Sequence, residues 1–416
     1  MFTEKNIVNW QLWAAAAYLA LLPSNAWTFT RSLAFGLSSG FAAVILVAGY
    51  LGRSTRVPSP GADILAPLLL WCAWSVASLA WSVNVDYSVG QLKREIGWSL
   101  LAMASFYVAA SSVAAWRTLV AVALAAFAVY ALLALGEAAT PGGWEPSRWH
   151  AGVGPYATHV ALIAPLLLTL PAPRPVGFNG RKSTLFAGSA LLVLLLASAR
   201  LTDNRIVWIA LAATFACAFA LAAWRWHASL ARAPLRWLSP LFALLIVLGV
   251  VFADVTRERA LSDFPPDTPV AQSLTGDPRL SLWEGTTQLI RERPWTGYGF
   301  GRAIVADRLK GTLGNPLLWH AHNLFVGQIV QTGIVGFALF AALLVAVCAR
   351  FVRYVRRGDD TLAVIGIVGA SLVAGFLVKN LTDDFLFRTN AKEFWALLGV
   401  LIGFGARLER RQPVGD

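Results

Sequence analysis

The sequence predicts an all-α polytopic membrane protein with about twelve transmembrane helices and one long exported loop containing short helices. Two observations carry this prediction. Of the 416 residues, 57% are hydrophobic and 13% are charged, whereas a soluble domain has about 25% charged residues. Apolar runs long enough to cross a bilayer recur along the whole chain. The mean hydropathy of +0.61 agrees with this class.

Pro, Gly and charged residues divide the apolar sequence into the predicted spans. Residues 1–254 are expected to hold nine spans, residues 255–321 the long exported loop, and residues 322–416 three more spans and a cytoplasmic tail. The 18 Trp residues, many of them near span ends, suit interfacial belts. The spans are predicted at residues 9–23, 30–51, 63–82, 95–115, 117–137, 155–172, 184–200, 204–224, 237–254, 322–349, 361–379 and 390–406.

The orientation of the chain follows from its basic loops. Half of the 34 Lys and Arg residues lie in loops that alternate along the chain, which places these loops and both termini in the cytoplasm. The net charge of +12 is therefore explained without nucleic acid. The N-terminus lacks a basic leader and a cleavage site, so the first span is expected to stay attached. The basic segments include RSTR (53–56), RPVGFNGRK (174–182), RWHASLARAPLR (225–236), RFVRYVRR (350–357) and RLERR (407–411).

The remaining basic residues lie on or near the exported side, against the usual bias of short loops. Such an excess calls for an anionic ligand, and a polyanion bound at the outer face of the membrane would satisfy it. The three cysteines lie inside apolar runs without a CxxC motif, so they predict neither a disulfide nor a metal cluster. The exported basic residues include Lys93, Arg94, Arg148, Arg200, Arg205, Lys379, Arg388 and Lys392.

The long exported loop contains a predicted helix that begins with Asp277 as N-cap and Pro278 as first residue, and that Pro294 ends. Its apolar side is expected to be formed by Leu280, Trp283, Thr287 and Ile290. Arg279 in its first turn could bind phosphate oxygens, because the free N–H groups there already favour an anion. The alternative is a salt bridge from Arg279 to Asp277 or Glu284.

Two further features of the loop follow this helix. The glycines of WTGYGFG (295–301) come after a Pro and not after a strand, so they indicate a tight turn with close backbone approach and not a nucleotide loop. His320 and His322 lie just before a span, without the carboxylate or Cys cluster that a zinc site would need. Each is a structural histidine or a general base that nearby arginines keep neutral.

Several other polar residues occupy the same side of the membrane. Arg205 begins a span after the predicted tight hairpin SARLTDNR, either as an interfacial residue paired with Asp203 or as part of a site. Asp383 and Asp384 could orient a histidine or simply pair with neighbouring basic residues. More distant candidates, each of which also has a purely structural reading, are Arg148, His150 and His159.

The order of these residues resembles the O-antigen ligase and polymerase superfamily. The resemblance rests on R-L-x-x-W at Arg279, P-x-x-G-x-G at Pro294 and H-N at His322 and Asn323, followed by a glycine-containing span. The LTDNR segment is similar to the arginine motif of that family, although Asn204 stands where Ser or Thr is usual. The likeness covers the whole predicted architecture, including the closing DD segment.

This resemblance implies a metal-independent glycosyltransferase without a cofactor, in the bacterial inner membrane with its site facing the periplasm. A glycan would pass from undecaprenyl diphosphate to the lipid A–core of lipopolysaccharide, with inversion. His322 would act as the base and Arg279 and Arg205 as diphosphate-binding cations. Membrane lipids are the other expected partners. Substrate-binding roles are expected for Arg148, Arg388, Asn323, Asp383, Asp384 and His320.

Three alternatives stay open at this point. The chain could be a polysaccharide polymerase or a protein O-oligosaccharyl ligase, which would use the same donor chemistry with another acceptor. A flippase or other transporter of lipid-linked glycans belongs to a different class. A transporter would place its charges at the middle of the membrane and show repeat-related halves, whereas the candidates here gather at one face.

Overall fold

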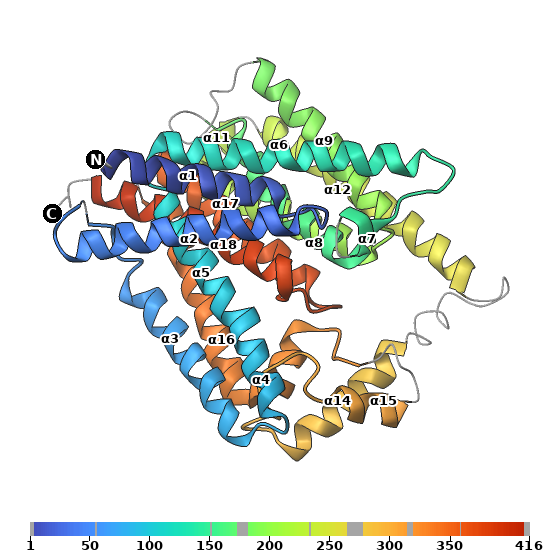
Figure 1. Cartoon of the computed structure of the whole chain (residues 1–416). Coiled ribbons are helices and arrows are strands. Elements are labelled where there is room, and N and C mark those ends of the chain that lie inside the picture. The colour runs from blue at the N-terminus through green and yellow to red at the C-terminus, as the bar shows by residue number, and fades with distance from the viewer. Residues whose placement is uncertain are drawn as a thin grey trace.

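The computed structural model describes residues 4–54, 56–149, 152–172, 182–232, 234–263, 278–313, 319–357 and 359–411. These residues form an all-helical fold without strands (Figure 1). The first part consists of α1 (Glu4–Leu21), α2 (Thr28–Tyr50), α3 (Ala62–Ala77), η1 (Ser78–Trp81), α4 (Val85–Gln91), η2 (Leu92–Gly97), α5 (Trp98–Ala109), α6 (Val113–Ala138), α7 (Pro146–Trp149), α8 (Val153–Ile163) and η3 (Ala164–Thr169). The second part consists of α9 (Lys182–Leu201), α10 (Arg205–Arg225), α11 (His227–Arg232), α12 (Pro234–Asp263), α14 (Pro278–Glu292), α15 (Ala306–Leu313), α16 (Leu324–Arg356), α17 (Asp360–Lys379) and α18 (Arg388–Arg411).

Seven stretches of helix in the described part of the chain are long and apolar enough to cross a membrane. They are α2, α3 with η1, α6, α9, α10, α16 and α17, and each coincides with a predicted span. The other five predicted spans fall on α1, α5, α8, α12 and α18, whose length and composition do not by themselves identify a span. The protein is therefore a multi-pass membrane protein, and twelve crossings stay a prediction.

Two helices extend further than the sequence predicts. α12 continues to Asp263, nine residues past the predicted span, and Glu258 on this extension accepts a hydrogen bond from Arg200 at the end of α9 (2.6 Å). α16 continues to Arg356, into the basic segment 350–357 that is predicted as a loop. The buried side chains of Phe351 and Tyr354 explain this continuation, because they give the basic segment an apolar side.

Small residues set the closest packing between helices. Gly399 and Gly403 of α18 face the backbone of α5 so closely that a Cβ atom at either position would overlap a carbonyl oxygen, of Met103 or of Tyr107. A pair of small residues four apart is a common means of bringing membrane helices together. α10 packs along α17 in the same way, with Gly375 against Thr214.

The predicted helix of the long loop is α14, which begins at Pro278 and ends at Glu292, just before Pro294. Its predicted N-cap, Asp277, lies outside the described residues. The buried side differs from the prediction, because Leu282 and Leu289 form its core and Trp283 and Ile290 pack at the edge. This small second core also includes Tyr298 and Leu309 of α15, which lies beside α14 at the lower right of Figure 1.

Candidate functional site

The site is built on a break in α16. Gly333 has a φ of 70° and a ψ of −178°, so the helical hydrogen bonds of this turn are missing. The loop after α14 replaces them, because the N–H groups of Tyr298 and Gly299 donate to the carbonyl oxygens of Val330 (3.0 Å) and Gln331 (2.9 Å). The indole of Trp74 donates to the next carbonyl oxygen, that of Thr332 (2.9 Å). A broken membrane helix is tolerated when neighbouring groups satisfy its backbone in this way.

The glycines of WTGYGFG allow this close approach, as the sequence predicts. Gly297 has a φ of 64°, and a Cβ there would lie 2.6 Å from the Val330 oxygen. Gly301 donates its N–H to Oε1 of Gln331 (2.9 Å), and the N–H of Ala303 donates to the hydroxyl of Tyr87 (2.9 Å). The residue between Gly301 and Ala303 is thus fixed on both sides.

Replacement of Gly333 by Ala is expected to destabilise the protein. The backbone at Gly333 is nearly restricted to glycine, and a Cβ atom there would overlap the carbonyl group of Trp295. We expect a loss of about 2 kcal/mol or more, measured as a lower thermal unfolding midpoint in detergent. Gly36→Ala in α2 is the matched control, because its Cβ would meet open space. Equal unfolding midpoints for the two variants would contradict the role of the break.

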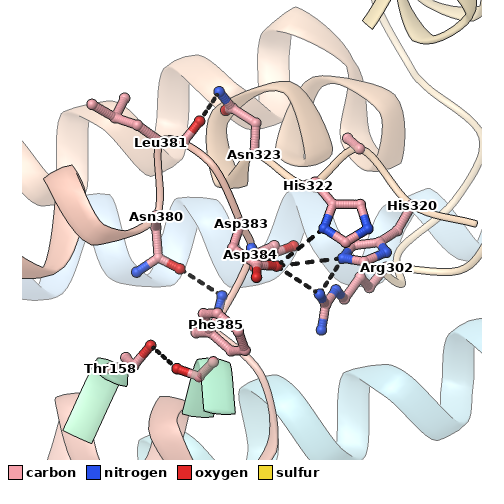
Figure 2. A network of polar contacts seen from close by, with 12 residues as sticks. Thr158, Arg302, His320, His322, Asn323, Asn380, Leu381, Asp383, Asp384 and Phe385 are labelled. Atoms are coloured by element: carbon pink, nitrogen blue, oxygen red, sulfur yellow. Dashed lines mark hydrogen bonds and ion pairs between the residues drawn. The ribbon is translucent and has the colours of Figure 1, made fainter. Parts of the chain in front are cut away.

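Arg302 is the residue fixed in this way, and it joins a cluster with His320, His322 and Asp383 (Figure 2). Its guanidinium group contacts Nε2 of His320 and lies 3.2 Å from Oδ1 of Asp383. Nδ1 of His322 faces the same oxygen at 3.5 Å, and the centroids of the two imidazole rings are 3.7 Å apart. One carboxylate therefore meets two imidazoles and one guanidinium.

The loops that carry the histidines and Asp383 are joined by backbone contacts. Asn323 caps α16 by accepting hydrogen bonds from the N–H groups of Phe325 and Val326, and its amide donates to the Leu381 oxygen (2.8 Å). Asn380 accepts from the N–H of Phe385 (2.5 Å), which closes the turn around Asp383. His322 has a φ of 46°, a strained value for a residue other than glycine. The fold therefore holds His322 and Asp383 in place.

The charges of the cluster follow from its contacts. Burial alone would raise the pKa of Asp383, but polar contacts with His320 and His322 oppose it. The positive charges of Lys379 and Arg302 act in the same direction, so the pKa of Asp383 lies far below its usual range. Burial lowers the pKa of His320 to about 4, although Asp383 opposes this shift. At neutral pH, Asp383 is thus a carboxylate and His320 is neutral.

Asp384, next to Asp383, is buried and makes no described ion pair with the two histidines. Burial raises the pKa of its carboxyl, although the charge of Arg302 opposes the shift. It lines a small cavity of about 20 Å³ together with Gln328 and Gln331 of α16. A cavity of this size has room for one water molecule. The two neighbouring carboxyls thus occupy different environments, and Asp383 is the one that faces the histidines.

The same side chains could also ligate a metal ion. His320, His322 and Asp383 bring one donor atom each within 4.8 Å of one another. The guanidinium group of Arg302, however, occupies Nε2 of His320 and contacts the Asp383 carboxylate. A cation in this position would have to displace another cation, so the donor set fits a metal ion poorly.

A cavity of about 270 Å³ opens beside the cluster. Arg302 forms part of its wall, with its guanidinium carbon 5.2 Å from the ring centroid of Trp319 and 5.1 Å from that of Phe387. His159 and Glu393, both buried, form another part and contact each other at 2.6 Å. The remaining lining residues are Leu22, Pro23, Asn25, Pro155, Phe385, Arg388, Thr389 and Asn390.

Of the predicted arginines, Arg388 lines this cavity and Arg205 lies at the same end of the helix bundle. Arg388 is the first residue of α18 and lines the cavity. Among the described residues no ion pair joins its side chain to a carboxylate, and its backbone N–H donates to the Glu95 carboxylate (2.8 Å). Arg205 is the first residue of α10. The last residue of α10, Arg225, pairs with the first residue of α17, Asp360 (2.9 Å), so the two helices run antiparallel. Arg205 thus lies at the bundle end where α17 leads into the Asp383 loop.

The other two predicted arginines have described backbones only. Arg279 is the second residue of α14, in the first turn as predicted, and Arg148 belongs to α7. Their side chains lie outside the described residues, as does the whole of His150. Their roles in binding therefore stay predictions.

Sequence reasoning missed Arg302 and the pair of His159 with Glu393. The signal for Arg302 was its position directly after the last glycine of WTGYGFG, since a turn that fixes the backbone also fixes the next side chain. The pairing of His159 with Glu393 joins residues 234 positions apart, and no local spacing predicts it. The sequence indicates His159 as a candidate but gives no sign of its partner Glu393.

Two comparisons with known proteins show what part of this chain is similar to. The profile of the O-antigen ligase family matches residues 190–341, which include Arg205, Arg279, Arg302 and both histidines of the cluster. The general O-oligosaccharyltransferase of Acinetobacter baylyi is 26% identical over 156 residues, which are 36% of this chain and 27% of the relative. The chain thus matches about a quarter of that relative's length. Over the matched residues the chain is thus similar to the O-antigen ligase superfamily.

Proposed function

We propose that this protein is an O-antigen ligase of the bacterial inner membrane. It transfers a glycan from undecaprenyl diphosphate to the lipid A–core of lipopolysaccharide at the periplasmic face. The observation that carries the proposal is the cluster in which Asp383 faces His322 at 3.5 Å, beside an arginine-lined cavity. A base next to an anion site is what transfer from a diphosphate donor requires.

In this reaction His322 is the general base. Its Nδ1 faces the Asp383 carboxylate, which favours the tautomer with the proton on Nδ1 and leaves Nε2 free to accept another proton. The separation of 3.5 Å is long for a hydrogen bond, as is common before substrate closes a site. Nε2 removes the proton of an acceptor sugar hydroxyl, whose oxygen attacks the anomeric carbon of the donor.

The bond from the anomeric carbon to the diphosphate breaks in the same step, and the electron pair leaves with the diphosphate. This leaving group keeps its negative charge, so cations stabilise it more than a proton donor would. Arg279 and Arg205 are assigned to this role, with Arg388 at the cavity wall. A single displacement inverts the anomeric configuration.

Arg279→Ala and Arg205→Ala are each expected to weaken donor binding about tenfold to a hundredfold, because a charge-assisted contact to phosphate is lost. Lysine should restore little, since it cannot bind two phosphate oxygens in one plane. Binding of a labelled lipid-linked donor to purified protein measures this. Arg291→Ala, on the other end of α14, is the control. Unchanged donor affinity in both variants would refute the diphosphate clamp.

A protein O-oligosaccharyl ligase is the second candidate, because the matched relative is named a general O-oligosaccharyltransferase and a protein is one acceptor that such an enzyme could use. The acceptor distinguishes the candidates. Purified protein should be given one lipid-linked donor and, separately, lipid A–core, a lipid-linked repeat unit or an acceptor protein, with a chelator present. Transfer to lipid A–core supports the ligase. Transfer only to the repeat unit or the protein would replace it by a polymerase or a protein ligase.

A further inference from the structure

A second cavity, of about 470 Å³, lies at the other end of the helix bundle. The 24-residue helix α18 joins the two ends and spans roughly 36 Å. It begins with Arg388 at the catalytic cavity and brings Arg407 and Arg410 to the second one. The sequence predicts that this end faces the cytoplasm. The other lining residues are Glu4, Val8, Ile45, Arg56, Val57, Pro58, Val108 and Ser111.

Two carboxylates near this end, those of Asp63 and Glu409, are paired with arginines of α16 and the residue after it. Asp63 contacts both Arg350 and Arg353. Glu409 lies 3.6 Å from Arg350 and 3.2 Å from Arg357. These two acids are therefore engaged outside the cavity.

The cavity itself carries an excess of positive charge. Three guanidinium groups, of Arg56, Arg407 and Arg410, line it against one carboxylate, that of Glu4. In the described part of the chain, no ion pair joins any of these three arginines to a carboxylate. Like charges gathered in one cavity repel each other unless an anion lies between them. The cavity is thus suited to an anionic group.

The frame around these charges is preformed. The hydroxyl of Tyr107 donates to the Pro58 oxygen (2.7 Å), which ties the segment after α2 to α5. The guanidinium group of Arg407 donates to the oxygens of Tyr107 (2.9 Å) and Gly403 (2.7 Å). The positions of the cavity walls therefore do not depend on a ligand, and little ordering is needed for binding.

Apart from Ser111, the rest of the wall is apolar, and it borders a second apolar hollow on α2. Val57 and Arg56 separate the cavity from a neighbouring one of about 310 Å³, which Leu46, Gly49 and Tyr50 line. Tyr50 is 86% exposed. A ligand that places an anion at Arg56 would thus meet apolar surface of α2 next to it. A phosphate group with attached acyl chains matches this arrangement of charge and apolar surface.

We infer that this cavity binds the phosphate head group of an anionic membrane phospholipid, with its acyl chains along α2. Basic pockets between helices at the cytoplasmic side are suited to such lipids. The inference does not depend on the proposed glycan transfer, because the two cavities lie at opposite ends of α18.

Native mass spectrometry of the purified protein tests this inference. The protein is titrated with phosphatidylglycerol and, separately, with phosphatidylcholine that has the same acyl chains. The wild type is expected to bind one phosphatidylglycerol at least about tenfold more tightly than phosphatidylcholine. Arg56→Gln together with Arg410→Gln should remove this preference. Arg53→Gln together with Arg232→Gln is the matched control, because it removes the same charge from exposed positions outside the cavity.

Three results would overturn the inference. The first is a preference for phosphatidylglycerol that survives in the Arg56→Gln and Arg410→Gln double variant. The second is loss of this preference in the control variant as well. The third is displacement of the lipid by equimolar soluble glycerophosphoglycerol. The last would mean that a free phosphoester binds. A photoactivatable phosphatidylglycerol on the wild type gives a second measurement that needs no variant. Crosslinks in the segments around Ile45 and Val57 support the lipid site, and crosslinks confined to other segments contradict it.

Discussion

His322→Ala is expected to reduce glycan transfer by at least about a hundredfold, because a positioned general base contributes about 10² to 10⁴ to the rate. Binding of the lipid-linked donor should stay close to wild type, since the phosphate-binding cations are unchanged. Transfer is measured with purified protein and lipid A–core, and donor binding is measured separately. Loss of transfer with retained donor binding identifies a group that acts in the chemical step.

Two further variants separate chemistry from folding. His322 has a φ of 46°, a conformation that Asn adopts more readily than Ala. His322→Asn should therefore fold like the wild type and be as inactive as His322→Ala. His227→Ala changes an exposed histidine of α11 and should leave transfer unchanged. Wild-type transfer by His322→Asn would disprove the assignment of the base.

Arg302→Ala is expected to lower transfer by roughly a hundredfold, which corresponds to loss of a charge-assisted contact in a buried site. The guanidinium group contacts His320 and Asp383 at once and lies between the rings of Trp319 and Phe387. A lysine in its place cannot make these planar contacts, so Arg302→Lys should recover little activity.

The pH dependence distinguishes this positioning role from a general loss of stability. The charge of Arg302 lowers the pKa of His320, so its removal should raise that pKa toward the ordinary value. Protonated His320 would then place a charge next to His322 below neutral pH. The acidic limb of the pH–rate profile should therefore move to higher pH. Arg308→Ala, which removes a pair with Glu292 in the same loop (2.9 Å), should leave the profile unchanged.

The helical class and seven of the spans follow from the sequence, because long apolar runs have one stable form in a bilayer. The sequence is less informative at α16. It contains Gly333 inside an apolar run, and nothing local indicates that the helix breaks there and that residues 294–301 satisfy its backbone. The continuation of α16 to Arg356 is also not predicted, because the basic residues of segment 350–357 indicate a loop and only the fold shows that Phe351 and Tyr354 are buried.

The sequence likewise indicates some residues of the candidate site and not others. His322 and Asp383 could be singled out, because a familiar order of motifs placed both on one side of the membrane. Arg302 could not, because its partners lie 18 and 81 residues away along the chain. Only the folded turn brings them together. Asn323 is an intermediate case, since the motif identified the residue but its side chain serves as the cap of α16.

The contact between residues 295–301 and α16 limits where the chain can accept inserted residues. Hydrogen bonds from Tyr298, Gly299 and Gly301 fix the register of the loop against α16, residue by residue. An insertion of one residue between Gly299 and Arg302 would move the guanidinium group away from His320 without changing either side chain. Homologous proteins that keep this chemistry should therefore tolerate insertions before residue 294 or after Ala303, and exclude them from residues 294–303.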